Sequence, residues 1–90
     1  MNVKFSVKKL CQKEGIGNFK LTPEEPIDIN LDELQKKPGF ETKRPIESVL
    51  IMKKGDVTWT ISKKNSSILI ENVKPDTPER ALELLNEIFS

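Results

Sequence analysis

The sequence predicts an α+β fold of two layers: an antiparallel sheet of about five strands, with one long C-terminal helix packed on one face, and one short helix. Two observations predict this fold. Short segments alternate apolar and polar residues with the period of two that is typical of half-buried strands, and turn residues such as Gly55 separate them. The segment 76–89 instead places its apolar residues at the spacing of an amphipathic helix. A sheet with helices on one side accommodates both patterns.

The length and composition predict a single domain over residues 1–90. Hydrophobic residues make up 36% of the chain and charged residues 32%, which is too apolar for a disordered protein. The formal net charge of +1 argues against a strongly basic nucleic-acid module. We expect a cytoplasmic protein that does not enter membranes, because no run approaches the roughly 20 apolar residues that span a bilayer and the N-terminus lacks the apolar core of a secretory signal.

The N-terminal region allows two interpretations. Apolar and polar residues alternate over residues 3–7, which predicts a strand. A competing helix would begin at Ser6 and end at Gly15, and the strand is the favoured interpretation. Residues 18–22 could form a second extended segment after the turn.

The segment INLDELQKKPG predicts the short helix. Asn30 is a suitable N-cap, and Glu33 occupies the capping-box position three residues later. Gly39 follows the helix as a stop signal. Only Leu31 and Leu34 can face inwards, so this helix can be no more than a brace.

Four strands are predicted to follow in antiparallel succession. Residues 40–44 and 47–54 provide two of them, and residues 57–72 form a hairpin that turns around Lys63–Asn65. The C-terminal helix is then predicted over residues 77–89, capped by Asp76 or Thr77. The residues expected to meet in the core are Leu50, Met52, Trp59, Ile61, Ile68 and Ile70 of the sheet and Leu82, Leu85 and Phe89 of the helix.

The chain lacks the residues of common catalytic sites. It has no histidine or tyrosine, which removes the usual general base and proton shuttle. The single cysteine, Cys11, is expected to be an inert thiol, because only lysines in its neighbourhood could activate it. No glycine-rich phosphate loop or nucleophile elbow occurs, and the carboxylates are interpreted as solvated residues. We therefore expect a protein that is not an enzyme and that has no cofactor or metal site.

The second face of the sheet is the candidate binding surface, because it is neither fully polar nor fully apolar. The residues expected on this open face are Val49, Ile51, Lys53, Thr58, Thr60, Ser62, Leu69 and Glu71. Lysines at strand ends and turns are candidates for phosphate contacts, namely Lys53, Lys54, Lys63 and Lys64. The alternative is that these lysines are solvated and block pairing of strand edges.

From about residue 28 to residue 89 the chain resembles one half-repeat of the TATA-box-binding protein fold. INLDELQKKPGFE resembles the family's LDLEELAKKLPGAEY, and ESVLIMK falls at the position of FPGLIYR. VTWTISKKNSSILIENVK resembles VTVLIFSSGKIVITGAK, and TPERALELLNEI takes the place of SEEEAEKAVEKL. The resemblance implies a half-repeat that runs strand, helix, four strands and long helix, with either residues 3–7 or residues 18–22 as its first strand.

The same resemblance implies that the family's DNA mechanism is absent. Each family half-repeat carries two phenylalanines that wedge between base steps, and these positions align with Glu47 and Ser62. A carboxylate repels phosphate and a serine is too small to wedge, so nothing would drive an unstacking that costs roughly a few kcal/mol per step. Lys53 keeps the basic character of a family arginine, whereas Glu71 replaces a threonine. The chain also has one half-repeat where the DNA saddle needs two.

We therefore expect a small binding domain that uses its open face or a strand edge for a protein partner or for self-association. Nucleic-acid binding through the sheet face and the lysine-rich turns is the alternative. A homodimer would share the first strand, which carries Val3, Phe5 and Val7. Lys4 and Lys8 of the same strand oppose such pairing, because charge on an edge strand prevents it.

Overall fold

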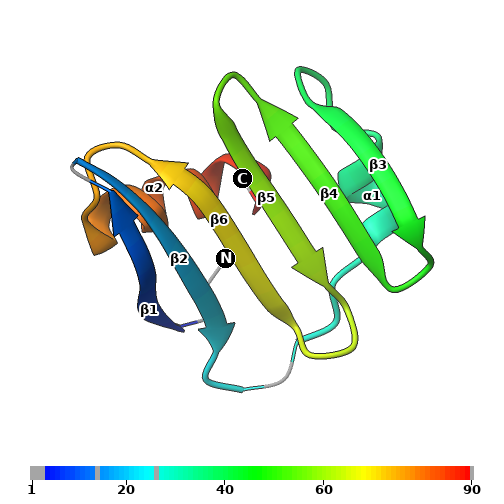
Figure 1. Ribbon diagram of the computed structural model, residues 1–90. Coiled ribbons are helices and arrows are strands. Elements are labelled where there is room, and N and C mark those ends of the chain that lie inside the picture. Colours follow the sequence, from blue (N-terminus) through cyan, green and yellow to red (C-terminus); the bar gives the residue numbers. More distant parts are fainter. Residues whose placement is uncertain (1–3, 14, 26, 90) are drawn as a thin grey trace.

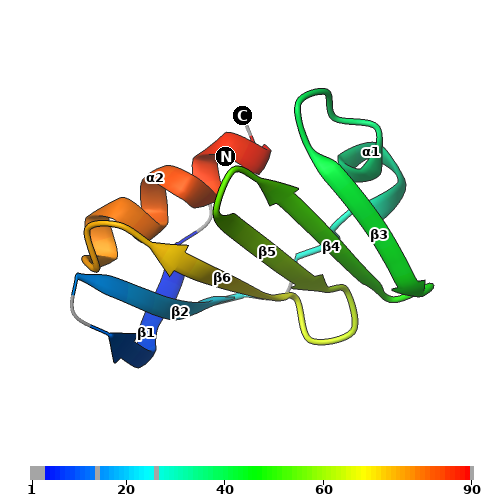
Figure 2. The same ribbon diagram turned by 45° about the horizontal axis from the view of Figure 1, so that its top comes forward.

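The computed structural model describes residues 4–13, 15–25 and 27–89, and these form an α+β fold with one six-stranded antiparallel sheet (Figure 1). In chain order the elements are β1 (Phe5–Lys13), β2 (Ile16–Pro23), α1 (Leu31–Gln35), β3 (Glu41–Ile46), β4 (Val49–Lys54), β5 (Val57–Ser62), β6 (Ser67–Val73) and α2 (Pro78–Phe89). The strands lie in the order β1-β2-β6-β5-β4-β3. Both helices lie on the same side of the sheet (Figures 1 and 2). No described element covers the other side, which we call the open face.

The N-terminal region forms two strands, so the expected count of about five strands is corrected to six. The first predicted segment forms β1 from Phe5 onwards, the segment 18–22 lies within β2, and the two strands pair as a hairpin. The alternative interpretation, a helix that begins at Ser6, is therefore wrong. Alternate residues of β2 are buried. In β1, the half-buried Phe5 and Val7 alternate with exposed residues. Gly15 turns the hairpin with φ of +74°, a conformation that favours glycine. Val3 and Pro26 lie outside the described residues.

The other predicted elements are confirmed. The side-chain oxygen of Asn30 accepts a hydrogen bond from the Glu33 amide at 3.1 Å, so Asn30 caps α1. Thr77 caps α2, because its hydroxyl oxygen accepts a hydrogen bond from the Arg80 amide at 3.2 Å. Strands β3 to β6 follow one another as antiparallel neighbours, as predicted.

Two rows of side chains across the four strands β2, β6, β5 and β4 form the sheet side of the core. The first row consists of Phe19, Ile70, Trp59 and Met52, and the second of Leu21, Ile68, Ile61 and Leu50. All eight are almost fully buried. The Trp59 indole N–H donates a hydrogen bond to the Leu84 carbonyl oxygen of α2 at 3.0 Å. Trp59 therefore lies on the helix side, which confirms the predicted register of the hairpin.

One predicted core residue of α2 is wrong. Leu82 is 39% exposed, whereas Leu84 and Leu85 are 2% and 4% exposed. The buried residues Ala81, Leu84, Leu85 and Ile88 follow the spacing of one helix stripe, and Leu82 lies at the margin of that stripe. Phe89 packs against the core while remaining half-buried.

Polar contacts hold the layer around α1 against the sheet. The Ser66 hydroxyl donates to the Ile27 carbonyl oxygen at 2.9 Å, which ties the turn between β5 and β6 to the segment before α1. The Arg44 guanidinium on β3 donates to the Asp32 carboxylate at 2.9 Å and to the Gln35 side-chain oxygen at 3.1 Å. The short helix is thus held by hydrogen bonds as well as by its two buried leucines.

Truncation of Leu85 to alanine is expected to lower the free energy of unfolding by about 2–5 kcal/mol, because it removes a fully buried side chain and leaves a cavity. The matched control is Leu82→Ala on the next turn of the same helix, which is expected to cost less than about 1 kcal/mol. Urea denaturation followed by the fluorescence of Trp59 measures both values. Equal losses for the two variants would contradict the packing described above.

Candidate functional site

All eight residues predicted for the open face share one side of the sheet. They alternate along β4, β5 and β6 with the buried core rows, so their side chains point away from α2. Lys53 is exposed and the other seven are half-buried. The half-buried apolar members are Val49, Ile51 and Leu69. Ile51 and Leu69 lie on either side of Thr60, and Val49 lies opposite Ser62.

The cross-strand register places one residue from each strand in a single line, which we call the central row. In strand order it consists of Lys8, Lys20, Leu69, Thr60, Ile51 and Lys43. Leucine, threonine and isoleucine occupy its middle, and lysines occupy both ends. The neighbouring row, towards the turn between β4 and β5, consists of Glu71, Thr58, Lys53 and Glu41, so it carries two carboxylates and one ammonium group. The central row contains no acidic residue.

Sequence reasoning missed the three lysines of the central row. Lys8 and Lys20 lie directly opposite each other on β1 and β2, and neither forms an ion pair with a described residue. Like charges in directly opposite positions destabilise a sheet. The alternation within each strand indicated which way these side chains point, but their common line depends on the strand order. The pair Lys8–Lys20 is therefore an uncompensated positive site at one end of the face.

Aromatic side chains are absent from the open face. The chain has five aromatic residues, and all of them are described. Phe5, Phe19 and Trp59 lie on the helix side of the sheet, and Phe89 lies on α2. The Phe40 ring meets Trp59 edge-on with centroids 5.2 Å apart. The face can therefore offer aliphatic, hydroxyl, ammonium and carboxylate groups to a ligand, but no aromatic ring on which a base could stack.

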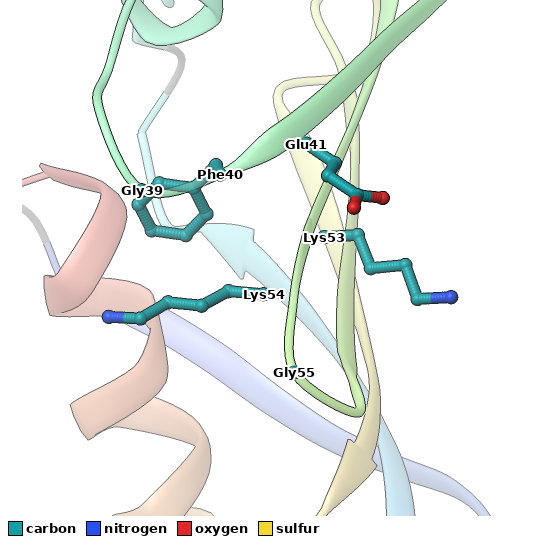
Figure 3. A pocket seen from close by; sticks show the side chains of 6 residues that line it. All are labelled: Gly39, Phe40, Glu41, Lys53, Lys54 and Gly55. Atoms are coloured by element: carbon teal, nitrogen blue, oxygen red, sulfur yellow. The ribbon is translucent and has the colours of Figure 1, made fainter.

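The four lysines predicted for phosphate contacts do not form one site. Figure 3 shows that the side chains of Lys53 and Lys54 point apart, as neighbours on a strand must. The Lys54 ammonium lies 3.2 Å from the Glu87 carboxylate and 5.5 Å from the centre of the Phe40 ring. Lys63 and Lys64 lie in the turn at the other end of β5. Of the four, only Lys53 is on the open face proper.

Two hollows on the surface combine charged and apolar side chains. The hollow in Figure 3, of about 540 Å³, is lined by Gly39, Phe40, Glu41, Lys53, Lys54 and Gly55. A larger hollow of about 830 Å³ is lined by Leu31, Asp32, Arg44, Ile46, Glu47, Ser48 and Lys63. Among the described residues no group of three histidine, cysteine, aspartate or glutamate side chains could hold a metal ion. The Cys11 side chain lies outside the described part of the chain.

The two positions that align with wedging phenylalanines differ in their placement. Glu47 is exposed in the turn between β3 and β4, where its carbonyl oxygen accepts hydrogen bonds from the Arg44 side chain at 2.7 and 3.0 Å. Ser62 ends β5 and lies opposite Val49 and Ser67. Neither side chain is an apolar wedge.

Two ion pairs lower the pKa of an aspartate. The hydrogen bond from Arg44, together with its charge, holds the pKa of Asp32 below its ordinary value of 3.8. The hydrogen bond from Lys9 at 2.8 Å does the same for the pKa of Asp76, against an opposing effect of burial. Lys9 also donates to the Asp76 carbonyl oxygen at 3.2 Å, so it ties β1 to the segment before α2. These two basic residues have structural partners and lie on the helix side of the sheet.

No protein-family model, curated protein or solved structure gives a significant match to this chain. In the described part of the chain no helix is long and apolar enough to cross a membrane.

Replacement of Asp76 by asparagine is expected to lower the stability at about pH 7 more than at about pH 2.5. The pKa of Asp76 is lowered by folding, so its contribution is present above the ordinary value of 3.8 and is lost as the pH falls through the folded-state pKa. Urea denaturation of both proteins at the two pH values measures the difference. Because the pair is on the surface, added salt should shrink the difference at about pH 7. A difference that grows on acidification would contradict this assignment.

Proposed function

We propose that this chain is a non-enzymatic binding domain whose open face binds a protein partner. The observation that carries the proposal is the central row, in which an apolar and threonine centre is flanked by lysines and is covered by no described helix. Exposed apolar surface rimmed by polar residues marks protein interaction sites. The chemistry that complements this row is an apolar strip with acidic residues on both sides.

The spacing of the lysines indicates the shape of this partner. Adjacent strands lie about 4.8 Å apart, so Lys20 on β2 and Lys43 on β3 are separated by roughly 19 Å across β6, β5 and β4. An α-helix with its side chains is about 10–12 Å wide. An amphipathic helix lying along the strands would thus contact Ile51 and Leu69 with its apolar side. Its acidic side chains could reach the lysines at both ends of the row.

The order of elements supports a TATA-box-binding-protein-like fold for this domain. From β2 to α2 the chain runs strand, short helix, four strands and long helix, which is the order that the resemblance implies. The family's DNA bending is not part of the proposal, because Glu47 and Ser62 supply no wedge.

Nucleic-acid binding is the second candidate, and the three lysines of the central row favour it. Such binding would rest on phosphate contacts alone, since the face has no aromatic residue on which a base could stack. Both arginines contact other parts of the chain, Arg44 through Asp32 and Arg80 through Glu83. Protein binding also uses the apolar centre of the face, which phosphate contacts leave unused. It is therefore the first proposal.

Leu69→Glu is expected to weaken face-directed binding by at least about tenfold, because it removes an apolar contact and repels an acidic partner. The probes are peptides of about 16 residues selected from a random library on the wild-type domain, and fluorescence anisotropy measures their affinities. The matched control is Asn65→Glu, which adds the same charge at an exposed position in the turn between β5 and β6. Its effect is expected to stay below about twofold.

The selected peptides are also expected to carry aspartate or glutamate on both sides of an apolar strip. Circular dichroism establishes that both variants keep the fold. Peptides that bind wild type and Leu69→Glu equally well would refute the open face as the binding surface.

Mixed single-stranded oligonucleotides and a TATA-containing duplex are expected to bind more weakly than about 1 μM at physiological salt, with no large bend in the duplex. Titrations at several salt concentrations, with a bending assay on the duplex, measure this. If the second candidate holds, phosphate contacts from Lys8, Lys20 and Lys43 would give a slope of about −2 for log K against log salt on single strands. A tight complex with a steep slope would favour nucleic-acid binding over the first proposal.

A further inference from the structure

The two edges of the sheet differ in their ability to accept another strand. The edge strand β3 contains Pro45, which has no N–H to donate, and its register shifts between Lys43 and Ile46. The other edge strand, β1, contains no proline, and its register with β2 is regular from Phe5 to Lys9 before it shifts between Lys9 and Cys11. Proteins commonly protect an edge with proline, a bulge or lysines. From Phe5 to Lys9, β1 has neither a proline nor a bulge, and its lysines oppose pairing with a basic strand but favour pairing with an acidic one.

The outward backbone groups of β1 can be assigned from one hydrogen bond. The Glu24 amide donates to the Lys4 carbonyl oxygen at 2.9 Å, so this pair is of the hydrogen-bonded type. The two types alternate along an antiparallel ladder. The backbone groups of Phe5, Val7 and Lys9 therefore point away from β2. They form a regular row of donors and acceptors that no other described strand uses.

The two sides of this edge differ in chemistry. On the helix side, Phe5 joins a groove of about 350 Å³ that is lined by Lys4, Phe5, Glu24, Leu82, Leu85, Asn86 and Phe89. Leu82, the exposed leucine of α2, is part of that groove. On the open side, Lys8 lies directly opposite Lys20, and neither lysine has an acidic partner among the described residues.

We propose that the β1 edge is a second interaction surface, which binds an extended acidic segment of a partner protein by strand addition. The added strand alternates apolar and acidic residues. Its apolar side chains contact Phe5 and Leu82 on the helix side, and its carboxylates lie beside Lys8 and Lys20 on the open side. This surface shares Lys8 and Lys20 with the central row, and it differs from the open face because it also uses the backbone of β1 and the groove beside α2.

Charge complementarity selects this occupant over a second copy of the chain. A second β1 would bring Ser6 and Lys8 to the open side and no carboxylate to compensate the lysine pair. A nucleic acid would supply negative charge, but it lacks backbone groups at strand spacing and apolar side chains for the groove. An acidic, apolar-alternating strand satisfies all three features of the edge.

Strand addition is tested with three fluorescently labelled peptides of about ten residues. The first alternates valine and glutamate, the second alternates valine and lysine, and the third has the composition of the first in blocks of like residues. The valine–glutamate peptide is expected to bind at least about tenfold more tightly than the other two. Its binding should shift the amide resonances of Phe5, Val7 and Lys9. Equal affinity of the three peptides would overturn the proposal.

Charge reversal and a backbone variant identify the surface that the peptide uses. Lys8→Glu is expected to lower the affinity for the valine–glutamate peptide by about tenfold and to raise the affinity for the valine–lysine peptide. Val7→Pro removes one outward N–H group and is expected to lower the affinity for both peptides. The matched control is Lys43→Glu, at the far end of the central row. Its affinity for the same peptides is expected to stay within about twofold of the wild-type value. A larger effect of Lys43→Glu than of Lys8→Glu would place the peptide on the open face and overturn the edge proposal alone.

The gain of binding to the valine–lysine peptide keeps the test decisive if Val7→Pro fails to fold.

Light scattering of the free protein over a hundredfold concentration range is expected to give a constant mass near 10.3 kDa. A dimer that Val7→Pro dissociates would overturn the proposal, because a second copy would then occupy the edge. Displacement of the acidic peptide by a mixed oligonucleotide at equal concentration would also overturn it, in favour of phosphate binding at the lysine pair.

Discussion

The contact between Trp59 and α2 is the interaction on which the rest of the structure depends. The indole lies in the first core row between Ile70 and Met52, and its N–H donates to the Leu84 carbonyl oxygen. A buried indole needs a partner for its N–H, and this hydrogen bond supplies it while the ring fills the space between the layers. Because successive strand residues face opposite sides, the burial of Trp59 assigns every other residue of β5 to one side or the other. Residues paired across neighbouring strands share a face, so the register with β4 and β6 then assigns the residues of those strands to the same two sides.

The composition of the open face is a consequence of this one-sided packing. The core uses the aromatic residues of the sheet, and the arginines hold the α1 layer and the start of α2. The outer side carries aliphatic, hydroxyl and lysine side chains, together with Glu41 and Glu71. Such a surface can contact apolar groups and attract carboxylates, but it cannot stack bases or wedge between them. The chemistry of the face therefore follows from which residues the core has already taken.

The two edges of the sheet add a second level of organisation. Pro45 and the shifted register interrupt one edge, whereas Phe5, Val7 and Lys9 leave a regular row of backbone groups on the other. The ion pair between Lys9 and Asp76 holds β1 near the start of α2, and the groove that includes Leu82 lies beside this strand. The apolar groove, the free strand edge and the uncompensated lysine pair therefore all lie along the β1 edge of the sheet.

The sequence by itself determined the local structure of most of the chain. Alternation identified β3 to β6 and the side on which Trp59 lies, and the caps at Asn30 and Thr77 marked where both helices begin. These features depend on residues close together in the chain, whose side chains and backbone groups interact within one element. The eight residues of the open face could be named for the same reason, since period two within a strand assigns its two faces.

The tertiary structure decided the features that depend on contacts between distant segments. Residues 5–13 could be a strand or a helix in isolation, and pairing with β2 made them a strand. Leu82 belongs to the apolar stripe of α2 by its spacing, yet the sheet is placed so that it remains exposed. The central row combines lysines from β1, β2 and β3, segments far apart in the chain, and no local pattern contains the strand order that aligns them. The buried rows run across β2, β6, β5 and β4, so the strand order depends on contacts between segments far apart in the chain. The location of charge on the face is therefore a property of the whole core.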